Sequence, residues 1–150
     1  MKPFIRIVRK PYEEPYHLHL VVMASNGRQR GELDIYTNVW DLELTAGRLR
    51  ELPIPGESAV LWELGSERPE DRFAFYFRVC LLRLSPTGQC AIELRFNNNR
   101  VPPDREVTEF SVHALPADLD RLAGLLEQFG RLEHRVLEWN VEEGELRDGA

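Results

Sequence analysis

The chain has 150 residues, a net charge of −6, 43% hydrophobic residues and 29% charged residues. This length suits one domain spanning residues 1–150, whose core can form without disulfides or metal ions. The acidic charge opposes binding to a nucleic-acid backbone and favours a basic partner. No segment approaches the roughly 20 apolar residues of a membrane span, and the start of the chain lacks the apolar run of a signal peptide. Two cysteines fit a reducing compartment, so we expect a cytoplasmic protein with no membrane partner.

Three strands and a helix are expected in the first third of the chain. The strands are predicted by alternating apolar residues at 4–9, 16–24 and 31–37. A tight turn at Asn26–Gly27 joins the last two as a hairpin. Asn38 is a candidate N-cap for the helix, whose apolar residues recur at helical spacing until Pro53 ends it.

The middle of the chain is expected to form four further strands, at 59–64, 73–84, 89–96 and 106–114. A turn at Pro86–Thr87 pairs residues whose numbers sum to about 173, which makes one face of this central hairpin continuously apolar. In that register Phe77 lies opposite Phe96. Cys90 falls on the apolar face and Cys80 on the other, so we predict two free thiols.

A second helix and a last strand are expected before the C-terminus. Pro116 lies near the start of the helix and Gly130 at its end. Residues 132–139 fit either a strand or a helical extension, and we favour the strand; residues 140–150 are expected to form a flexible acidic tail. The order β-β-β-α-β-β-β-β-α-β predicts an α+β fold in which two helices cover a single antiparallel β-sheet of about six to seven strands.

His17 and His19 are the best candidate metal ligands, because residues i and i+2 of a strand share a face. A complete site needs further ligands, and neither His113 nor His134 has diagnostic spacing, so two solvent-facing histidines are the favoured interpretation. No nucleophile motif is present, and the GRQRG segment at 27–31 lacks the spacing and the lysine of a phosphate-binding loop. The sequence therefore predicts no cofactor and no enzymatic activity.

Three regions are candidate contacts for a protein partner. The acidic segment 57–71 is one, although a solvated face is the simpler interpretation. A tyrosine on the polar side of the central hairpin could contact a partner. Alternatively, its ring could pack beneath a helix that covers the sheet, with only the hydroxyl reaching water. The RFNNNRVPP segment at 95–103 could contact a partner or only turn the chain, and we favour the turn. The candidate residues are Glu63, Glu67, Glu70, Asp71, Tyr76, Asn98, Asn99 and Arg100.

The order of the elements also resembles a known family. The stretches HLHLVVMASNGRQRGELDIYT, RLRELP, LWELGSE and FYFRVCLLRLSPTGQCAIELRF precede a terminal helix. Over nearly the whole chain, this arrangement is similar to small uncharacterised bacterial α+β proteins near the WapI-type toxin-immunity family. The resemblance implies a cytosolic antidote that binds and blocks a toxin, and it assigns no functional residue.

Together these patterns predict a non-enzymatic protein-binding domain, most concretely a bacterial immunity protein that neutralises a basic toxin domain by binding it. The acidic charge would steer such a partner and speed association. Two alternatives stay open. One is an assembly module that forms a homodimer through a sheet edge or the Tyr76 face. The other is a metal-dependent enzyme that uses His17 and His19.

Overall fold

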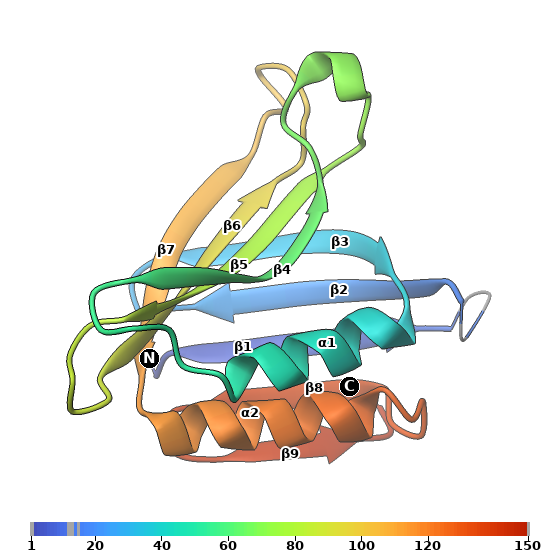
Figure 1. The fold of residues 1–150 in the computed structure, drawn as a ribbon. Helices are drawn as coiled ribbons and strands as arrows, with labels where there is room; N and C mark the ends of the chain where they lie inside the picture. Colours follow the sequence, from blue (N-terminus) through green and yellow to red (C-terminus); the bar gives the residue numbers. More distant parts are fainter. Residues whose placement is uncertain (1, 12–13, 15, 150) are drawn as a thin grey trace.

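The computed structural model describes residues 2–11, 14 and 16–149, and it confirms the predicted α+β class (Figure 1). The strands in this part of the chain are β1 (Phe4–Lys10), β2 (Leu18–Ser25), β3 (Arg30–Thr37), β4 (Ser58–Gly65), β5 (Tyr76–Arg83), β6 (Cys90–Asn97), β7 (Val107–Ala114), β8 (Val136–Asn140) and β9 (Gly144–Arg147). The helices are α1 (Val39–Leu49), the short 3-10 helix η1 (Pro69–Asp71) and α2 (Pro116–Phe129).

The strands form two antiparallel sheets, so the prediction of a single sheet of six to seven strands is wrong. The first sheet has five strands in the order β3-β2-β1-β8-β9, and the second has four in the order β4-β5-β6-β7. Helix α1 carries the chain from the first sheet to the second, and α2 carries it back. Local hydrophobic patterns describe each strand but not its neighbours, which is why they did not separate the two sheets.

The first sheet brings the two ends of the chain together. β1 pairs with β8, with Phe4 opposite Asn140. This pairing confirms a strand in the second half of residues 132–139. The edge strand β9 lies within 140–150, the segment predicted to be a flexible tail. Its sequence, GELR, is too short and too polar to give a strand signal of its own.

The central hairpin of β5 and β6 has the predicted register. Phe77 lies opposite Phe96, and both side chains are buried. Cys90 is 1% exposed on the core side, whereas Cys80 is half-buried on the opposite side, and both thiols are free. The alternation of apolar and polar residues was sufficient to predict the register of this hairpin, because a shift by one residue would expose the whole apolar face.

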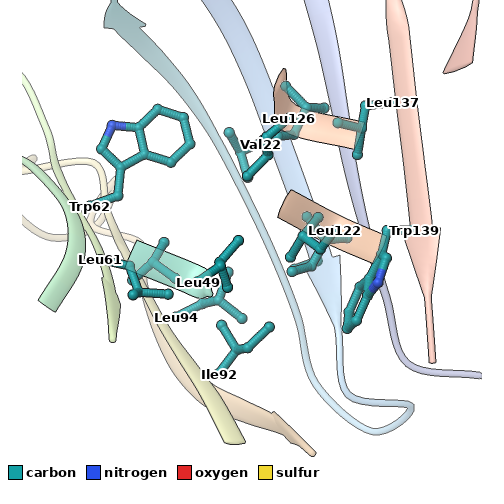
Figure 2. Packing of buried hydrophobic residues seen from close by; sticks show 14 of the residues in the cluster. Val22, Leu49, Leu61, Trp62, Ile92, Leu94, Leu122, Leu126, Leu137 and Trp139 are labelled. Atoms are coloured by element: carbon teal, nitrogen blue, oxygen red, sulfur yellow. The ribbon is translucent and has the colours of Figure 1, made fainter. Parts of the chain in front are cut away.

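A hydrophobic core lies between the inner faces of the two sheets and the two helices (Figure 2). The sheets meet at β3, β6 and β7, where Gly31 lies against the ring of Phe96. Elsewhere α1 packs on β4, α2 packs on β8 and β9, and the helices pack on each other, so they fill the space between the sheets. Trp139 is buried from β8, and its indole Nε1 donates a 2.9 Å hydrogen bond to the Asp118 carbonyl.

Both helices begin at the signals expected from the sequence. The side-chain oxygen of Asn38 accepts a 3.0 Å hydrogen bond from the Asp41 N–H, as an N-cap does. Helix α2 begins at Pro116, and the Asp118 carboxylate accepts a 2.9 Å hydrogen bond from the Leu115 N–H. Within the described residues, neither helix combines the length and the apolar character that crossing a membrane requires.

Candidate functional site

Charged and polar side chains cover the outer face of the four-stranded sheet, opposite the core. Tyr76 is only 7% exposed there, and its hydroxyl donates a hydrogen bond to the Glu63 carboxylate. Burial raises the pKa of Tyr76 to about 12, and the hydrogen bond and charge of Glu63 add to the shift. Tyr76 is therefore a protonated donor at neutral pH, and little of its ring is accessible to a partner.

Two arginines continue this polar layer beside Tyr76. Arg78 lies 2.9 Å from the Glu109 carboxylate and 3.4 Å from Glu93. Arg95 lies 3.6 Å from the same Glu109 carboxylate. These pairs join β5, β6 and β7 across the outer face, so the polar side chains predicted for this face neutralise one another.

Glu67 connects this network to the acidic segment 57–71. Its carboxylate accepts hydrogen bonds from Arg95 Nε at 2.9 Å and from the Asn97 side-chain amide at 2.5 Å. Burial alone would raise the pKa of Glu67, but these hydrogen bonds and the charges of Arg95 and Arg78 outweigh it and hold the pKa below its ordinary value. Glu67 is therefore ionised and neutralised within the protein.

The other acids predicted at the tip of this segment also have internal partners. Glu70 lies 2.8 Å from Arg68, and Asp71 accepts a 2.6 Å hydrogen bond from the Ser66 hydroxyl. Exposed pairs of this kind contribute little to stability. The charge that segment 57–71 gains from outside its own sequence is that of Arg95, which is paired with Glu67.

The three asparagines of RFNNNRVPP build the turn between β6 and β7. The side-chain oxygen of Asn97 accepts a 2.8 Å hydrogen bond from the Asn99 N–H. The side-chain oxygen of Asn98 accepts hydrogen bonds from the backbone N–H groups of Arg100 at 3.2 Å and Glu106 at 3.0 Å. Asn99 has a left-handed φ of 52°. Asparagine tolerates this conformation better than most residues, so the turn-forming role favoured from the sequence is confirmed.

Asn99 also ties this turn to the acidic segment. Its side-chain amide donates hydrogen bonds to the backbone carbonyl oxygens of Ser66 at 2.8 Å and Phe73 at 3.0 Å. The β6–β7 turn and the η1 loop between β4 and β5 therefore lie side by side at the far end of the second sheet (Figure 1). Two regions that the sequence singled out separately form one structure.

An open cleft of about 670 Å³ lies between these two loops. It is termed the arginine cleft because five arginines line it: Arg68, Arg72, Arg95, Arg100 and Arg105. Among the described residues that line it, Glu67 is the only one with a carboxylate. The sequence pointed to Arg100 alone, because the other four arginines are scattered along the chain and only the fold gathers them.

A second exposed surface lies at the junction of β3 and α1. The ring centroids of Tyr16 and Trp40 are 5.6 Å apart, and the two side chains are 66% and 53% exposed. Leu44 lies one helical turn after Trp40 and is also exposed. Tyr36, at the end of β3, is stacked on His19 and is exposed as well. The exposed side chains Tyr16, Trp40 and Leu44 are termed the aromatic surface, and Tyr36 precedes it on the outer face of β3.

The chain around the aromatic surface is acidic. Between Arg30 and Arg48 it contains four carboxylates and no lysine or arginine. These carboxylates are Glu32, Asp34, Asp41 and Glu43. On β3 the alternation of the strand places Glu32 and Asp34 on the same face as Tyr36. Sequence reasoning missed this surface, and the signal that could have found it was a run of acids and aromatic residues uninterrupted by a basic residue.

His17 and His19 do not share a strand face. β2 begins at Leu18, so His17 precedes the strand. Nε2 of His19 lies 2.9 Å from the Asp34 carboxylate on the neighbouring strand. Across residues 2–11, 14 and 16–149, no group of three or more His, Cys, Asp or Glu side chains is arranged to hold a metal ion. His19 thus has a carboxylate neighbour, and the described residues around it do not form a metal-binding group of three or more such side chains.

The hydrophobic core contains a small void of about 30 Å³. Apolar side chains line it, among them Leu49, Trp62 and Leu122. A void of this size has room for about one water molecule and none for an organic ligand.

No known protein family, curated protein or solved structure matches this chain. Its function is therefore inferred from the two surfaces described above, the arginine cleft and the aromatic surface.

Proposed function

We propose that this chain is a non-enzymatic protein-binding domain that docks a basic protein partner on its aromatic surface. The observation that carries the proposal is the exposure of Trp40 and Tyr16, whose contacting rings are both more than half exposed. Aromatic side chains are frequent anchors of protein interfaces, because they bury a large area at a small cost in conformational entropy. Leu44 extends the same apolar surface along α1.

The charges around this surface indicate the chemistry of the partner. Exposed carboxylates of Glu32, Asp34 and Glu43 lie along β3 and α1, with no basic residue in the intervening chain. A partner with lysines and arginines around an apolar pocket would be attracted, and an acidic partner would be repelled. The acids of segment 57–71 are less suitable for this role, because Glu67 and Glu70 are already paired with arginines.

In its most concrete form, the partner is a basic toxin domain and this chain is a cytoplasmic bacterial immunity protein. The net charge of −6 supports this form, as does the resemblance to the WapI-type immunity family. Blocking a toxin requires only a stable surface of complementary shape and charge. Helix α1 supplies Trp40 and Leu44 of the aromatic surface, and a regular element holds side chains more rigidly than a loop does.

The test uses the product of the neighbouring gene as the partner and measures association by surface plasmon resonance. The association rate should fall from low to high salt, because screening weakens steering by charge. Trp40→Ala should weaken binding by about 30-fold or more, the scale of an interface hot spot. Phe73→Ala is the matched control, since Phe73 is 52% exposed and Trp40 is 53% exposed.

Each result bears on a different part of the proposal. Equal binding by Trp40→Ala and the wild type would reject the aromatic surface, and a salt-independent association rate would reject the basic partner. A mass that doubles with concentration in sedimentation, without any partner, would favour the assembly module through a sheet edge, since Tyr76 is too buried to anchor a dimer. Stoichiometric metal in the purified protein would favour the enzyme that uses His17 and His19.

A further inference from the structure

We propose that the arginine cleft binds a phosphate-bearing small molecule at a site separate from the aromatic surface. Three of its arginines carry the proposal: Arg72, Arg100 and Arg105 line the cleft and are exposed. Among the described residues, no carboxylate or other acceptor pairs with the guanidinium groups of these three arginines. Their charge is therefore available to a ligand.

The remaining charges of the cleft are compensated within the protein. Arg68 is paired with Glu70. Arg95 is paired with Glu67, the carboxylate of the lining, and with Glu109 on β7. The uncompensated charge facing the cleft is therefore that of the three unpaired guanidinium groups. A guanidinium group stays protonated at any physiological pH, and its planar fork matches two oxygens of a phosphate.

The cleft has its shape before any ligand enters. Asn99 holds the two walls together through hydrogen bonds to the Ser66 and Phe73 carbonyls. Asn97 adds a second connection through the Glu67 carboxylate. Arg72 has a left-handed φ of 55°, which is uncommon for a residue other than glycine, and the surrounding loop maintains it. A backbone held in this way loses little conformational entropy when an anion binds, so the entropic cost is that of ordering the exposed arginine side chains.

The distribution of charge favours a small anion over a nucleic acid. The lining holds five of the nineteen lysines and arginines of the chain but one of its twenty-five acids. The chain as a whole has a net charge of −6, so a long polyanion that extends beyond the cleft would be repelled by the rest of the protein. The volume of about 670 Å³ lies in the usual range of small-molecule sites.

Two apolar side chains indicate what the phosphate is attached to. Phe73 is 52% exposed and Val101 is 76% exposed, and both line the cleft beside the arginines. A ring carried by the ligand could stack on Phe73 while the phosphate pairs with Arg72 and Arg100. The cleft therefore fits a phosphate ester that carries a ring, such as a mononucleotide, better than inorganic phosphate.

The test is calorimetric titration of the full chain with AMP, sodium pyrophosphate and adenosine at constant ionic strength. AMP should bind at least about tenfold more tightly than adenosine if the phosphate is recognised by charge-assisted hydrogen bonds. The triple variant Arg72→Gln, Arg100→Gln and Arg105→Gln should weaken AMP binding by about 100-fold or more. Phe73→Ala should weaken the binding of AMP and leave that of pyrophosphate unchanged.

A second triple variant has the same net charge and controls for non-specific attraction: Arg28→Gln, Arg131→Gln and Arg135→Gln. These arginines are exposed and lie outside the cleft lining, so this variant should bind AMP like the wild type. Circular dichroism checks that both triple variants fold. Equal loss of AMP binding in the two variants would overturn the proposal.

Two-dimensional NMR of the wild type provides an independent measurement. AMP should shift the amide signals of residues 66–74 and 97–105 and leave those around Arg28 in place. Shifts spread over all exposed arginines would overturn the site. Tighter binding of a tetraglutamate peptide or a single-stranded DNA oligomer than of AMP would overturn the assigned ligand class.

Discussion

The side-chain amide of Asn99 donates a 2.8 Å hydrogen bond to the backbone carbonyl of Ser66 and so joins the β6–β7 turn to the loop between β4 and β5. The turn residues of RFNNNRVPP therefore form one wall of the arginine cleft. Forming a turn and presenting Arg100 to a ligand are compatible roles of this segment. The side chains of Asn97, Asn98 and Asn99 form hydrogen bonds within the protein, whereas no described residue pairs with the guanidinium group of Arg100.

Replacing Asn99 tests this connection. Asn99→Gly keeps the left-handed φ without strain and removes the amide, so the change isolates its hydrogen bonds to Ser66 and Phe73. We expect the free energy of unfolding to fall by about 1–2 kcal/mol, as for the loss of two hydrogen bonds. Urea denaturation at neutral pH measures this free energy of unfolding. Arg100→Gln is the control and should leave the free energy of unfolding unchanged. An unchanged value for Asn99→Gly would show that the two loops associate by other contacts.

The ion pair of Glu67 with Arg95 predicts a pH dependence of stability. The pKa of Glu67 lies below its ordinary value of 4.5, so the ionised carboxylate stabilises the folded state above that pH. The contribution is lost as the pH falls through the lowered pKa of the folded state. Glu67→Gln should therefore reduce the free energy of unfolding at neutral pH by about 1 kcal/mol or less, since a third of the side chain is exposed.

Urea denaturation of Glu67→Gln and the wild type over a range of pH checks this sign. The two free energies should converge as the pH falls below 4.5, because protonated Glu67 and glutamine are both neutral. Glu51→Gln is the control, since Glu51 is an exposed acid outside this network. A difference for Glu67→Gln that is the same at neutral and acid pH would contradict the ion-pair explanation.

Two glycines test where the sheets touch. A Cβ added to Gly31 would lie 2.4 Å from the Phe96 ring, whereas one added to Gly47 meets nothing within 4 Å. Gly31→Ala should destabilise the fold by about 1–3 kcal/mol through overpacking between the two sheets. Gly47→Ala, in the interior of α1, should stabilise it by about 0.5–1 kcal/mol. Thermal denaturation measures both; a neutral Gly31→Ala would mean that the sheets separate easily at this contact.

The two thiols should differ in accessibility and share a low reactivity. Burial raises the pKa of Cys80 and of Cys90 above the ordinary value, so little thiolate exists at neutral pH. Cys80 is half-buried and Cys90 is almost inaccessible, so iodoacetamide should modify Cys80 first and Cys90 only after unfolding. Mass spectrometry follows both reactions. A mass that depends on prior reduction would instead indicate a disulfide.

Much of the fold followed from patterns a few residues long. Alternation predicted the register of Phe77 with Phe96, and capping chemistry predicted the helix starts at Asn38 and Pro116. These features depend on neighbours in the chain, so they are visible without the fold. The strand β9 was missed because its four residues, GELR, are too few and too polar to show an alternating pattern.

The candidate sites were harder to predict than the elements. The acids of segment 57–71 make it a candidate partner contact from the sequence, and the structure adds that Arg95 from a different strand neutralises Glu67. Arg72 and Arg105 gave no signal of their own, and they become important because their loops meet at Asn99. The net effect of a charge depends on which opposite charges lie within a few ångströms, and those partners come from distant parts of the chain.

The chain's amino-acid order was therefore enough to specify which side chains face inward and where most strands and helices begin, because both are properties of short-range periodicity and backbone preference. The division into two sheets and the gathering of five arginines in one acidic protein came from contacts between distant segments. Such contacts form where burial over the whole molecule outweighs the entropy of closing long loops, and no single stretch of sequence contains that balance.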